Sequence, residues 1–288
     1  MPARPCCFPD RLTVGAVALV ALLSQPTPTH AQARGAATPP ATAAPSAAPP
    51  AAPPAAPSLG GAARWADSVR LLAEHGYLSG DTTLLAAGYR LAQRSLTVFP
   101  DDPLLLHYQG YIRYRQAQQQ RDFDTALPLF EESVALLERS VATRPLPETH
   151  ALLASAFGSM IGDSMLRGIR FGMKASDAED QAVALAPRNP RVLMLRAVSA
   201  WYKPAAFGGG EEKARTMLQQ ALQAFSADAP ARPLPAWGRA EAYAWLGQME
   251  AKAGNREAAR AAYGQALALA PAFAWVQYVL KPQLERTR

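Results

Sequence analysis

The feature that most constrains the fold is a helix–turn–helix pattern that recurs from about residue 62 to the C-terminal region. Apolar residues recur there at spacings of three and four, and alternating strand-like runs are missing. Short breaks rich in Pro, Gly, Asp and Asn separate the apolar segments. We therefore expect five helix pairs and a last helix, over residues 62–77 with 82–98, 103–119 with 124–143, 148–169 with 171–186, 190–203 with 211–225, 237–253 with 256–270, and 272–285.

The clearest unit spans residues 240–273. Its first helix carries an aromatic residue and then Leu-Gly, its second helix carries two alanines around a tyrosine, and a proline closes it: Tyr243, Leu246, Gly247, Ala259, Tyr263, Ala266 and Pro271. The small residues stand where the two helices must approach closely, and Gly247 gives the first helix room for its partner. Because a proline cannot continue a helix, Pro271 starts the next turn.

Other segments repeat parts of this unit: Ala182 with Pro187; Ala214, Leu218 and Ala221; Ala126, Phe130 and Ser133; and Gly88, Ala92, Ser95 and Pro100. The pattern resembles the tetratricopeptide repeat (TPR), a helix hairpin of about 34 residues. Glu250 departs from it, since the family usually has tyrosine there. The resemblance covers about residues 80–285. It implies an all-α fold, a right-handed α-solenoid of about five TPR-like hairpins plus a C-terminal capping helix, with the first helix of each pair on the concave face.

The N-terminal residues 1–33 have the three parts of a secretory signal peptide. Arg4 and Arg11 precede an apolar run over residues 12–23, and Ala31-Gln32-Ala33 is a small-x-small cleavage site. The run is shorter than the roughly 20 residues that span a bilayer, so we expect no membrane span in the mature form. The sequence therefore predicts a periplasmic or secreted protein that is cleaved after Ala33. An uncleaved anchor or a mis-assigned start codon is the alternative.

Residues 34–61 are rich in Ala and Pro and have no periodic apolar face, which predicts a disordered linker. Residues 62–288 then form the repeat domain. Cys6 and Cys7 precede the apolar run, whereas a lipoprotein signal places its cysteine just after that run. The mature chain thus has no cysteine for a disulfide, a thiolate metal site or a nucleophile.

Charge and ligand spacing exclude two further classes. The formal net charge of +6 is mild, and the basic residues are interspersed with acidic ones rather than gathered into a stripe, so we expect no nucleic-acid partner. Beyond residue 33 the histidines are His75, His107 and His150, and none is four residues from another metal ligand in a zinc-helix pattern. We expect no metal and no cofactor.

Catalysis and phosphate binding also lack the residues they need. No Gly-x-Ser-x-Gly elbow occurs, and no nucleophile, base and orienting residue can be placed together. The glycines at 208–210 precede Glu211 and Glu212, and acids at a helix start repel an anion. Residues 204–209 followed by Ala214 resemble a loop of exported bacterial repeat proteins, among them the T-components of some periplasmic solute transporters. Those are typically lipoproteins, and the lipid cysteine is absent here.

Aromatic and basic residues on the first helices are the candidate binding site. By the geometry of the family they face the concave groove, and aromatic rings and arginine are common anchors of interfaces. The alternative is that the rings are core residues between helices. The predicted groove residues are His107, Tyr111, Tyr114, Arg115, Arg191, Met194, Trp201, Gln248 and Lys252.

The sequence thus favours a non-enzymatic periplasmic or secreted scaffold that binds a peptide or protein partner in its concave groove. The alternative, implied by the T-component resemblance, is a small-molecule or lipidic ligand-binding accessory protein of a periplasmic transport system. An open polar groove with scattered aromatic residues would indicate the scaffold, and an enclosed apolar pocket would indicate the ligand-binding protein.

Overall fold

The computed structural model describes residues 60–286, which are helical throughout apart from turns and connecting segments. The signal peptide predicted at 1–33 and most of the linker predicted at 34–61 lie outside these residues. The elements are α1 (Gly61–Ser79), α2 (Thr82–Leu96), α3 (Pro103–Gln118), α4 (Phe123–Thr143), α5 (Pro147–Ser159), α6 (Met165–Leu185), α7 (Pro190–Tyr202), η1 (Ala205–Phe207), α8 (Glu211–Phe225), α9 (Arg239–Lys252), α10 (Arg256–Leu269), η2 (Val276–Leu280) and α11 (Lys281–Arg286).

Local sequence explains where the helices begin. The side chains of Asp81, Asp102 and Asn189 accept hydrogen bonds from the first free N–H groups of α2, α3 and α7. Prolines occupy the first turn of α3, α5 and α7, where a missing N–H costs nothing because no partner exists for it. These signals place the expected turns within a few residues of those observed.

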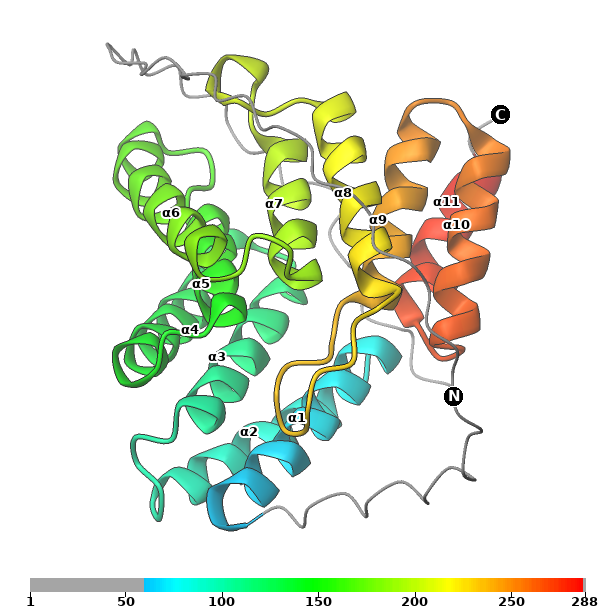
Figure 1. Ribbon diagram of the computed structural model, residues 1–288. Helices are drawn as coiled ribbons and strands as arrows, with labels where there is room; N and C mark the ends of the chain where they lie inside the picture. Colours follow the sequence, from blue (N-terminus) through cyan, green and yellow to red (C-terminus); the bar gives the residue numbers. More distant parts are fainter. Residues whose placement is uncertain (1–59, 287–288) are drawn as a thin grey trace, which may run out of the picture. The chain divides into compact units, whose positions relative to one another are not determined.

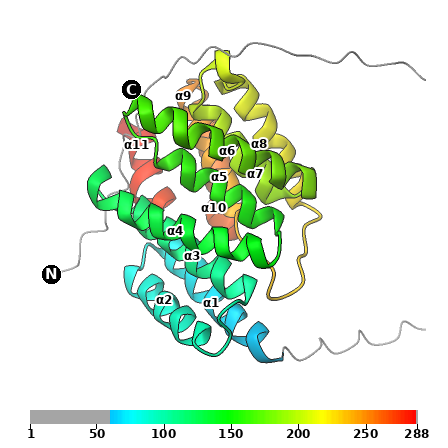
Figure 2. The same cartoon turned by 90° about the vertical axis from the view of Figure 1, so that its left-hand side faces the viewer.

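Adjacent helices pack as five antiparallel hairpins: α1 with α2, α3 with α4, α5 with α6, α7 with α8, and α9 with α10. The first helices α1, α3, α5 and α7 also contact one another in order, so the hairpins stack along the chain (Figures 1 and 2). The η2–α11 segment packs on α9 and α10, as expected of a cap. The all-α solenoid of about five TPR-like hairpins with a C-terminal cap is thereby confirmed.

The unit over residues 240–273 packs as its residue pattern predicted. Ala259 and Ala266 are fully buried, and a Cβ placed on Gly247 would overlap the ring of Tyr263. Glu250, the departure from the family pattern, is buried and pairs with Arg215 of α8 at 3.0 Å. It therefore links the fourth hairpin to the fifth.

One predicted boundary is wrong. The sequence pattern predicted a helix over 148–169, but α5 ends at Ser159 and α6 begins at Met165. Gly162 between them has a positive φ of 52°, which favours glycine, and the Ser164 side chain caps α6 by accepting from the N–H of Arg167. Residues 160–164 therefore form a turn that divides the expected helix in two.

Candidate functional site

Six of the nine predicted groove residues are buried: His107, Tyr111, Tyr114, Arg115, Arg191 and Met194. They lie on the inner helices α3 and α7, which other elements cover. The expectation that these six line an open groove is therefore corrected. The physical reason is that other parts of the chain cover them. The segment between α8 and α9 covers Tyr111 and Arg191, α1 and α9 cover Arg115, and neighbouring hairpins enclose the rest.

Arg115 shows this closure most clearly. Its side chain is 1% exposed, and its two terminal nitrogens donate to the carboxylate of Glu241 on α9 at 2.9 and 2.5 Å. The hydroxyl of Tyr77 on α1 donates to the same carboxylate at 3.0 Å, and its ring centroid lies 3.7 Å from the guanidinium carbon. Burial acts to lower the pKa of Arg115, but the carboxylate of Glu241 holds it well above its ordinary value. Arg115 is thus committed to a carboxylate of its own chain.

The segment between α8 and α9, residues 226–238, fills the inner face beside α3. The hydroxyl of Tyr108 donates to the carbonyl oxygen of Pro233 at 2.5 Å. The guanidinium of Arg191 donates to both carboxylate oxygens of Asp228, at 3.2 and 2.5 Å. The ring of Trp237 packs against that of Tyr111, with centroids 5.4 Å apart. Figure 1 shows this α8–α9 segment running from the yellow helix α8 to α1.

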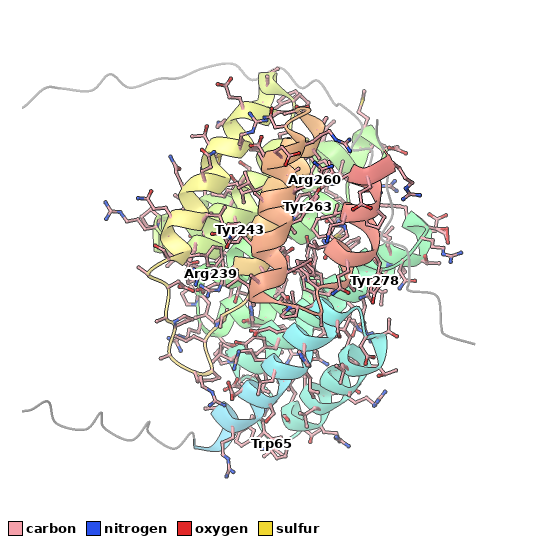
Figure 3. All side chains as sticks on the ribbon, turned by 90° about the vertical axis from the view of Figure 1, so that its right-hand side faces the viewer. Trp65, Arg239, Tyr243, Arg260, Tyr263 and Tyr278 are labelled. Atoms are coloured by element: carbon pink, nitrogen blue, oxygen red, sulfur yellow. The ribbon has the colours of Figure 1, made fainter. Side chains whose placement is uncertain are left out.

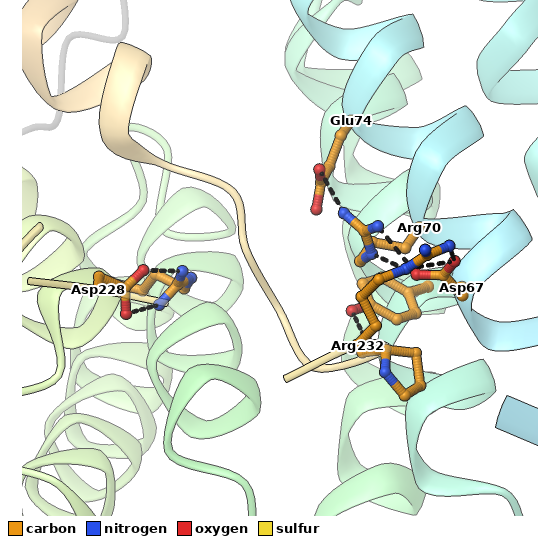
Figure 4. Close-up of polar contacts among 8 residues, drawn as sticks. Asp67, Arg70, Glu74, Asp228 and Arg232 are labelled. Atoms are coloured by element: carbon orange, nitrogen blue, oxygen red, sulfur yellow. Dashed lines mark hydrogen bonds and ion pairs between the residues drawn. The ribbon is translucent and has the colours of Figure 1, made fainter. Parts of the chain in front are cut away.

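An ion-pair cluster joins the α8–α9 segment to α1 (Figure 4). Arg232 of the segment pairs with Asp67, and Arg70 bridges Asp67 and Glu74, with donor–acceptor distances of 2.9 and 3.0 Å. The hydrogen bond from Arg232 lowers the pKa of the Asp67 carboxyl against the opposing effect of burial, and Arg70 lowers it further. Burial raises the pKa of Glu74, although Arg70 opposes that shift. The first hairpin is therefore tied to a segment about 165 residues further along the chain.

His107 is a core residue. Its Nδ1 lies 2.9 Å from the Thr149 hydroxyl, and burial, with the nearby Arg191 charge, lowers its pKa to about 3. The ring is consequently neutral at physiological pH. Tyr114 packs on Phe130, with ring centroids 5.8 Å apart, and the Met194 side chain lies against Gly238. These three residues hold helices together rather than face a partner.

Three predicted groove residues remain accessible near the C-terminal ends of α7 and α9. Trp201 and Gln248 are partly exposed, and Lys252 is exposed. The Lys252 ammonium lies 4.8 Å from the centroid of the Trp201 ring and 2.7 Å from a carboxylate oxygen of Glu211. The structure therefore brings Trp201 and Lys252 together, as expected of residues on neighbouring first helices.

Aromatic residues that the sequence analysis did not select extend this surface. The rings of Tyr202 and Trp245 are 6.2 Å apart, and those of Trp245 and Trp275 are 5.0 Å apart. We call Trp201, Tyr202, Trp245 and Trp275 the aromatic strip. Trp201, Tyr202 and Trp245 are partly exposed, whereas Trp275 is buried at the cap. The spacing of Glu241, Trp245, Gln248 and Lys252 at four, three and four residues is the signal that could have found this face of α9.

A pocket with a cavity volume of about 210 Å³ lies where the first and last hairpins meet. We call it the closure pocket. Arg239, at the start of α9, is among the residues that line the pocket, and Figure 3 labels this arginine near α10. Its lining residues come from α1, α3, the α8–α9 segment, the start of α9 and the end of α10: Glu74, Tyr77, Leu78, Tyr111, Ala236, Trp237, Gly238, Arg239, Ala240, Glu241, Leu269 and Ala270.

The glycine loop before α8 is a closed turn. The N–H of Gly209 donates to the carbonyl of Pro204, and that of Gly210 to the carbonyl of Ala200. These amides are therefore used within the chain and do not form a phosphate cradle. Within residues 60–286, no three or more His, Cys, Asp or Glu side chains gather as metal ligands. None of the helices described is both long and apolar enough to cross a membrane.

Three solved structures resemble the fold. TTC0263, a thermophilic TPR protein in Thermus thermophilus, matches with a TM-score of 0.54 and 20% identity, covering 77% of this chain and 97% of that chain. The HusA haemophore from Porphyromonas gingivalis matches at 0.49 and 24%, covering 66% and 92%. The APC/C hetero-tetramer Cut9-Hcn1 matches at 0.42 and 19%, covering 76% and 38%.

No family model and no curated protein sequence matches the chain. The likeness to TTC0263 shows the helical-repeat fold of the TPR type, and at 20% identity it shows the fold alone.

Proposed function

We propose that the protein is an exported, non-enzymatic scaffold that binds a protein or peptide segment across the aromatic strip. The observation that supports this most is the strip itself, a run of rings on α7 and α9 that ends at Trp275, just before η2, with exposed Lys252 at its edge. Tryptophan and tyrosine contribute most of the binding energy at many interfaces, because they bury much apolar area and lose little side-chain entropy.

The α8–α9 segment supports a polypeptide as the partner. The inner helices already hold this stretch of their own chain through a backbone carbonyl at Pro233, the ion pair of Asp228 and the ring of Trp237. The same kinds of contact hold an extended segment of another protein in a groove. At the other end of α7 and α9, the aromatic strip has comparable chemistry and is not fully covered by the described chain.

The protein is proposed to act in the periplasm or outside the cell. This rests on the signal-peptide pattern in residues 1–33. N-terminal sequencing of the protein isolated from the source cell should begin at Arg34. A protein recovered from the cytosol with Met1 still in place would contradict export.

A crosslinking experiment tests the partner surface. A photoreactive residue replaces exposed Lys252 beside the strip, and in a matched variant it replaces exposed Gln219 on α8. Irradiation of intact cells should give a protein adduct of defined mass at position 252 and none at 219. Adding Trp201→Ala should abolish the adduct while the thermal midpoint stays within a few degrees, because Trp201 is only partly buried. Equal adducts at both positions would refute the strip as the specific surface.

The alternative, a ligand-binding accessory protein of a transport system, has the closure pocket in its favour. A carrier would copurify with a small molecule whose loss leaves the 252 crosslink unchanged. Mass spectrometry of the denatured, purified protein measures this directly.

A further inference from the structure

The outer face of α6 carries a cluster of exposed apolar side chains. Met165, Leu166 and Met173 are 63%, 79% and 60% exposed, and Ile169 between them is partly exposed. Their spacing of three and four residues places them on one side of the helix, opposite the side that is buried against α5. We call these four residues the α6 stripe. Exposed apolar residues scattered singly need no explanation, but a cluster of them marks a contact surface.

No part of the described chain covers the α6 stripe. The helix packs mainly on α5 and only slightly on α7. It lies at the edge of the stack in Figure 1 and on the near face in Figure 2. A Cβ placed on Gly172, next to Met173, would meet nothing within 4 Å. Between residues 60 and 286, no other stretch of nine residues has three large apolar side chains exposed to this degree.

The charge beside the α6 stripe is positive. Residues 164–176 contain Arg167, Arg170 and Lys174 and no acidic residue. Arg170 and Lys174 are exposed and lie four residues apart along one edge of the stripe. Lys174 is 3.9 Å from Glu138 of α4, but both side chains are about half exposed, so water screens this pair. The helix dipole adds positive charge at the same end of α6. The surface therefore suits an anionic partner with an apolar layer.

The small size of the α6 stripe favours lipid over protein. A standard protein interface buries about 800 Å² on each partner and involves roughly 20–30 residues a side. The stripe has four residues within one short stretch of a single helix, and none of them is aromatic. A lipid surface needs no complementary shape. It accepts a few apolar side chains about 5–10 Å deep, and anionic headgroups attract the cations beside them.

We propose that the α6 stripe attaches the protein reversibly to an anionic phospholipid membrane. Leu166 and Met173 enter the boundary between headgroups and acyl chains, and Arg170 and Lys174 contact the lipid phosphates. The attachment is peripheral and spans nothing. The stripe lies on the second helix of the third hairpin, whereas the aromatic strip lies on α7, α9 and the cap, so the inference does not rest on the proposed function.

Cosedimentation with vesicles tests the attachment. The protein is the chain that begins at Arg34 and contains every described residue, because the apolar run at residues 12–23 would itself enter lipid. Vesicles of phosphatidylcholine with roughly 30% phosphatidylglycerol should bind at least about tenfold more tightly than vesicles of phosphatidylcholine alone at about 0.1 M salt. Higher salt should weaken this binding. Equal binding to both vesicles, or none to the anionic ones, would overturn the proposal.

Replacing the apolar side chains tests the α6 stripe itself. Leu166→Gln with Met173→Gln should reduce binding to the anionic vesicles at least about tenfold, because both side chains lose their gain from entering lipid. The thermal midpoint should stay unchanged, since both side chains are exposed in the free protein. The matched control is Leu71→Gln with Val98→Gln, which are 50% and 68% exposed at the first hairpin. Equal binding by both variants would contradict the assignment of α6.

Replacing the cations separates local charge from net charge. Arg170→Gln with Lys174→Gln should weaken binding to the anionic vesicles about tenfold and leave binding to phosphatidylcholine unchanged. Arg90→Gln with Arg94→Gln on α2 has the same four-residue spacing, the same exposure class and the same change in net charge, and it should have little effect. Equal losses in the two variants would attribute binding to net charge and overturn the role of this face.

Two other occupants of the α6 stripe give different results. A second copy would appear as a dimer in sedimentation equilibrium without lipid, and Leu166→Gln with Met173→Gln would dissociate it. An acidic protein would form an adduct with a photoreactive residue placed at position 173 in intact cells. Either result would overturn the proposal. A monomer in solution and a phospholipid adduct at position 173 would support it.

Discussion

Replacing Arg115 tests whether the closure of the stack contributes to stability. The residue joins α3 to Glu241 on α9 across 126 positions of the chain. In Arg115→Met, the alkyl chain fills much of the same volume, but the carboxylate of Glu241 stays buried with the Tyr77 hydroxyl as its remaining donor. Breaking one partner of a buried pair costs about 3–5 kcal/mol, so we expect a loss of about 4 kcal/mol in the free energy of unfolding.

The double variant Arg115→Met with Glu241→Leu gives the decisive comparison. Both charges are then removed, the Tyr77 hydroxyl loses its acceptor, and the partly buried Oε1 of Gln118 loses the donor Arg115. An apolar replacement of a buried pair is often close to neutral, so the double variant should stay within about 2 kcal/mol of the native protein. It should therefore be more stable than Arg115→Met alone.

Urea denaturation followed by far-UV circular dichroism measures these differences. The control is Lys252→Met, which breaks the ion pair between Lys252 and Glu211. These two side chains are 57% and 49% exposed, so the loss should be less than about 1 kcal/mol. A loss below about 1 kcal/mol for Arg115→Met would refute a stabilising role for the Arg115–Glu241 pair. So would a double variant whose loss equals the sum of the losses of Arg115→Met and Glu241→Leu measured separately.

Three further predictions follow from the core. The pKa of His107 is lowered to about 3, against 6.5 for the free side chain, so the unfolded chain binds a proton at this residue at a higher pH than the folded chain does. The contribution of His107 to stability is therefore complete above pH 6.5 and is lost as the pH falls toward 3, by up to about 1.4 kcal/mol per pH unit. Urea titrations at several pH values should show that His107→Gln removes this contribution to the slope. Gly247→Ala should lose about 1–3 kcal/mol through overpacking, whereas Gly264→Ala, whose Cβ meets nothing within 4 Å, should gain about 0.5–1 kcal/mol; opposite shifts of the thermal midpoint check this. Ala259→Leu should likewise cost about 1–3 kcal/mol and Glu257→Ala less than about 0.5 kcal/mol by urea denaturation, and equal effects would argue against the packing of α10.

The local pattern of the sequence determined the helices and the packing within each hairpin. The spacing of Ala214, Leu218 and Ala221 predicted a buried face, and all three are fully buried. Gly247 was expected to admit the partner helix, and the Tyr263 ring occupies that space. These contacts join residues within one hairpin, so helical periodicity and side-chain size are enough to place them. The turn between α5 and α6 was missed because its glycine and serine signals were assigned to a helix.

Only the tertiary structure decided which inner residues face a partner. Periodicity shows that Tyr111 and Arg115 lie on one face of α3, but it does not show what covers that face. Glu241 and Trp237 cover it, and both come from more than 100 residues further along the chain. An ion pair or ring contact over such a separation leaves no local spacing in the sequence. Trp201 and Lys252 lie close together as expected because they lie on the first helices of neighbouring hairpins, whereas the burial of Tyr111 and Arg115 depended on how the two ends of the stack came together.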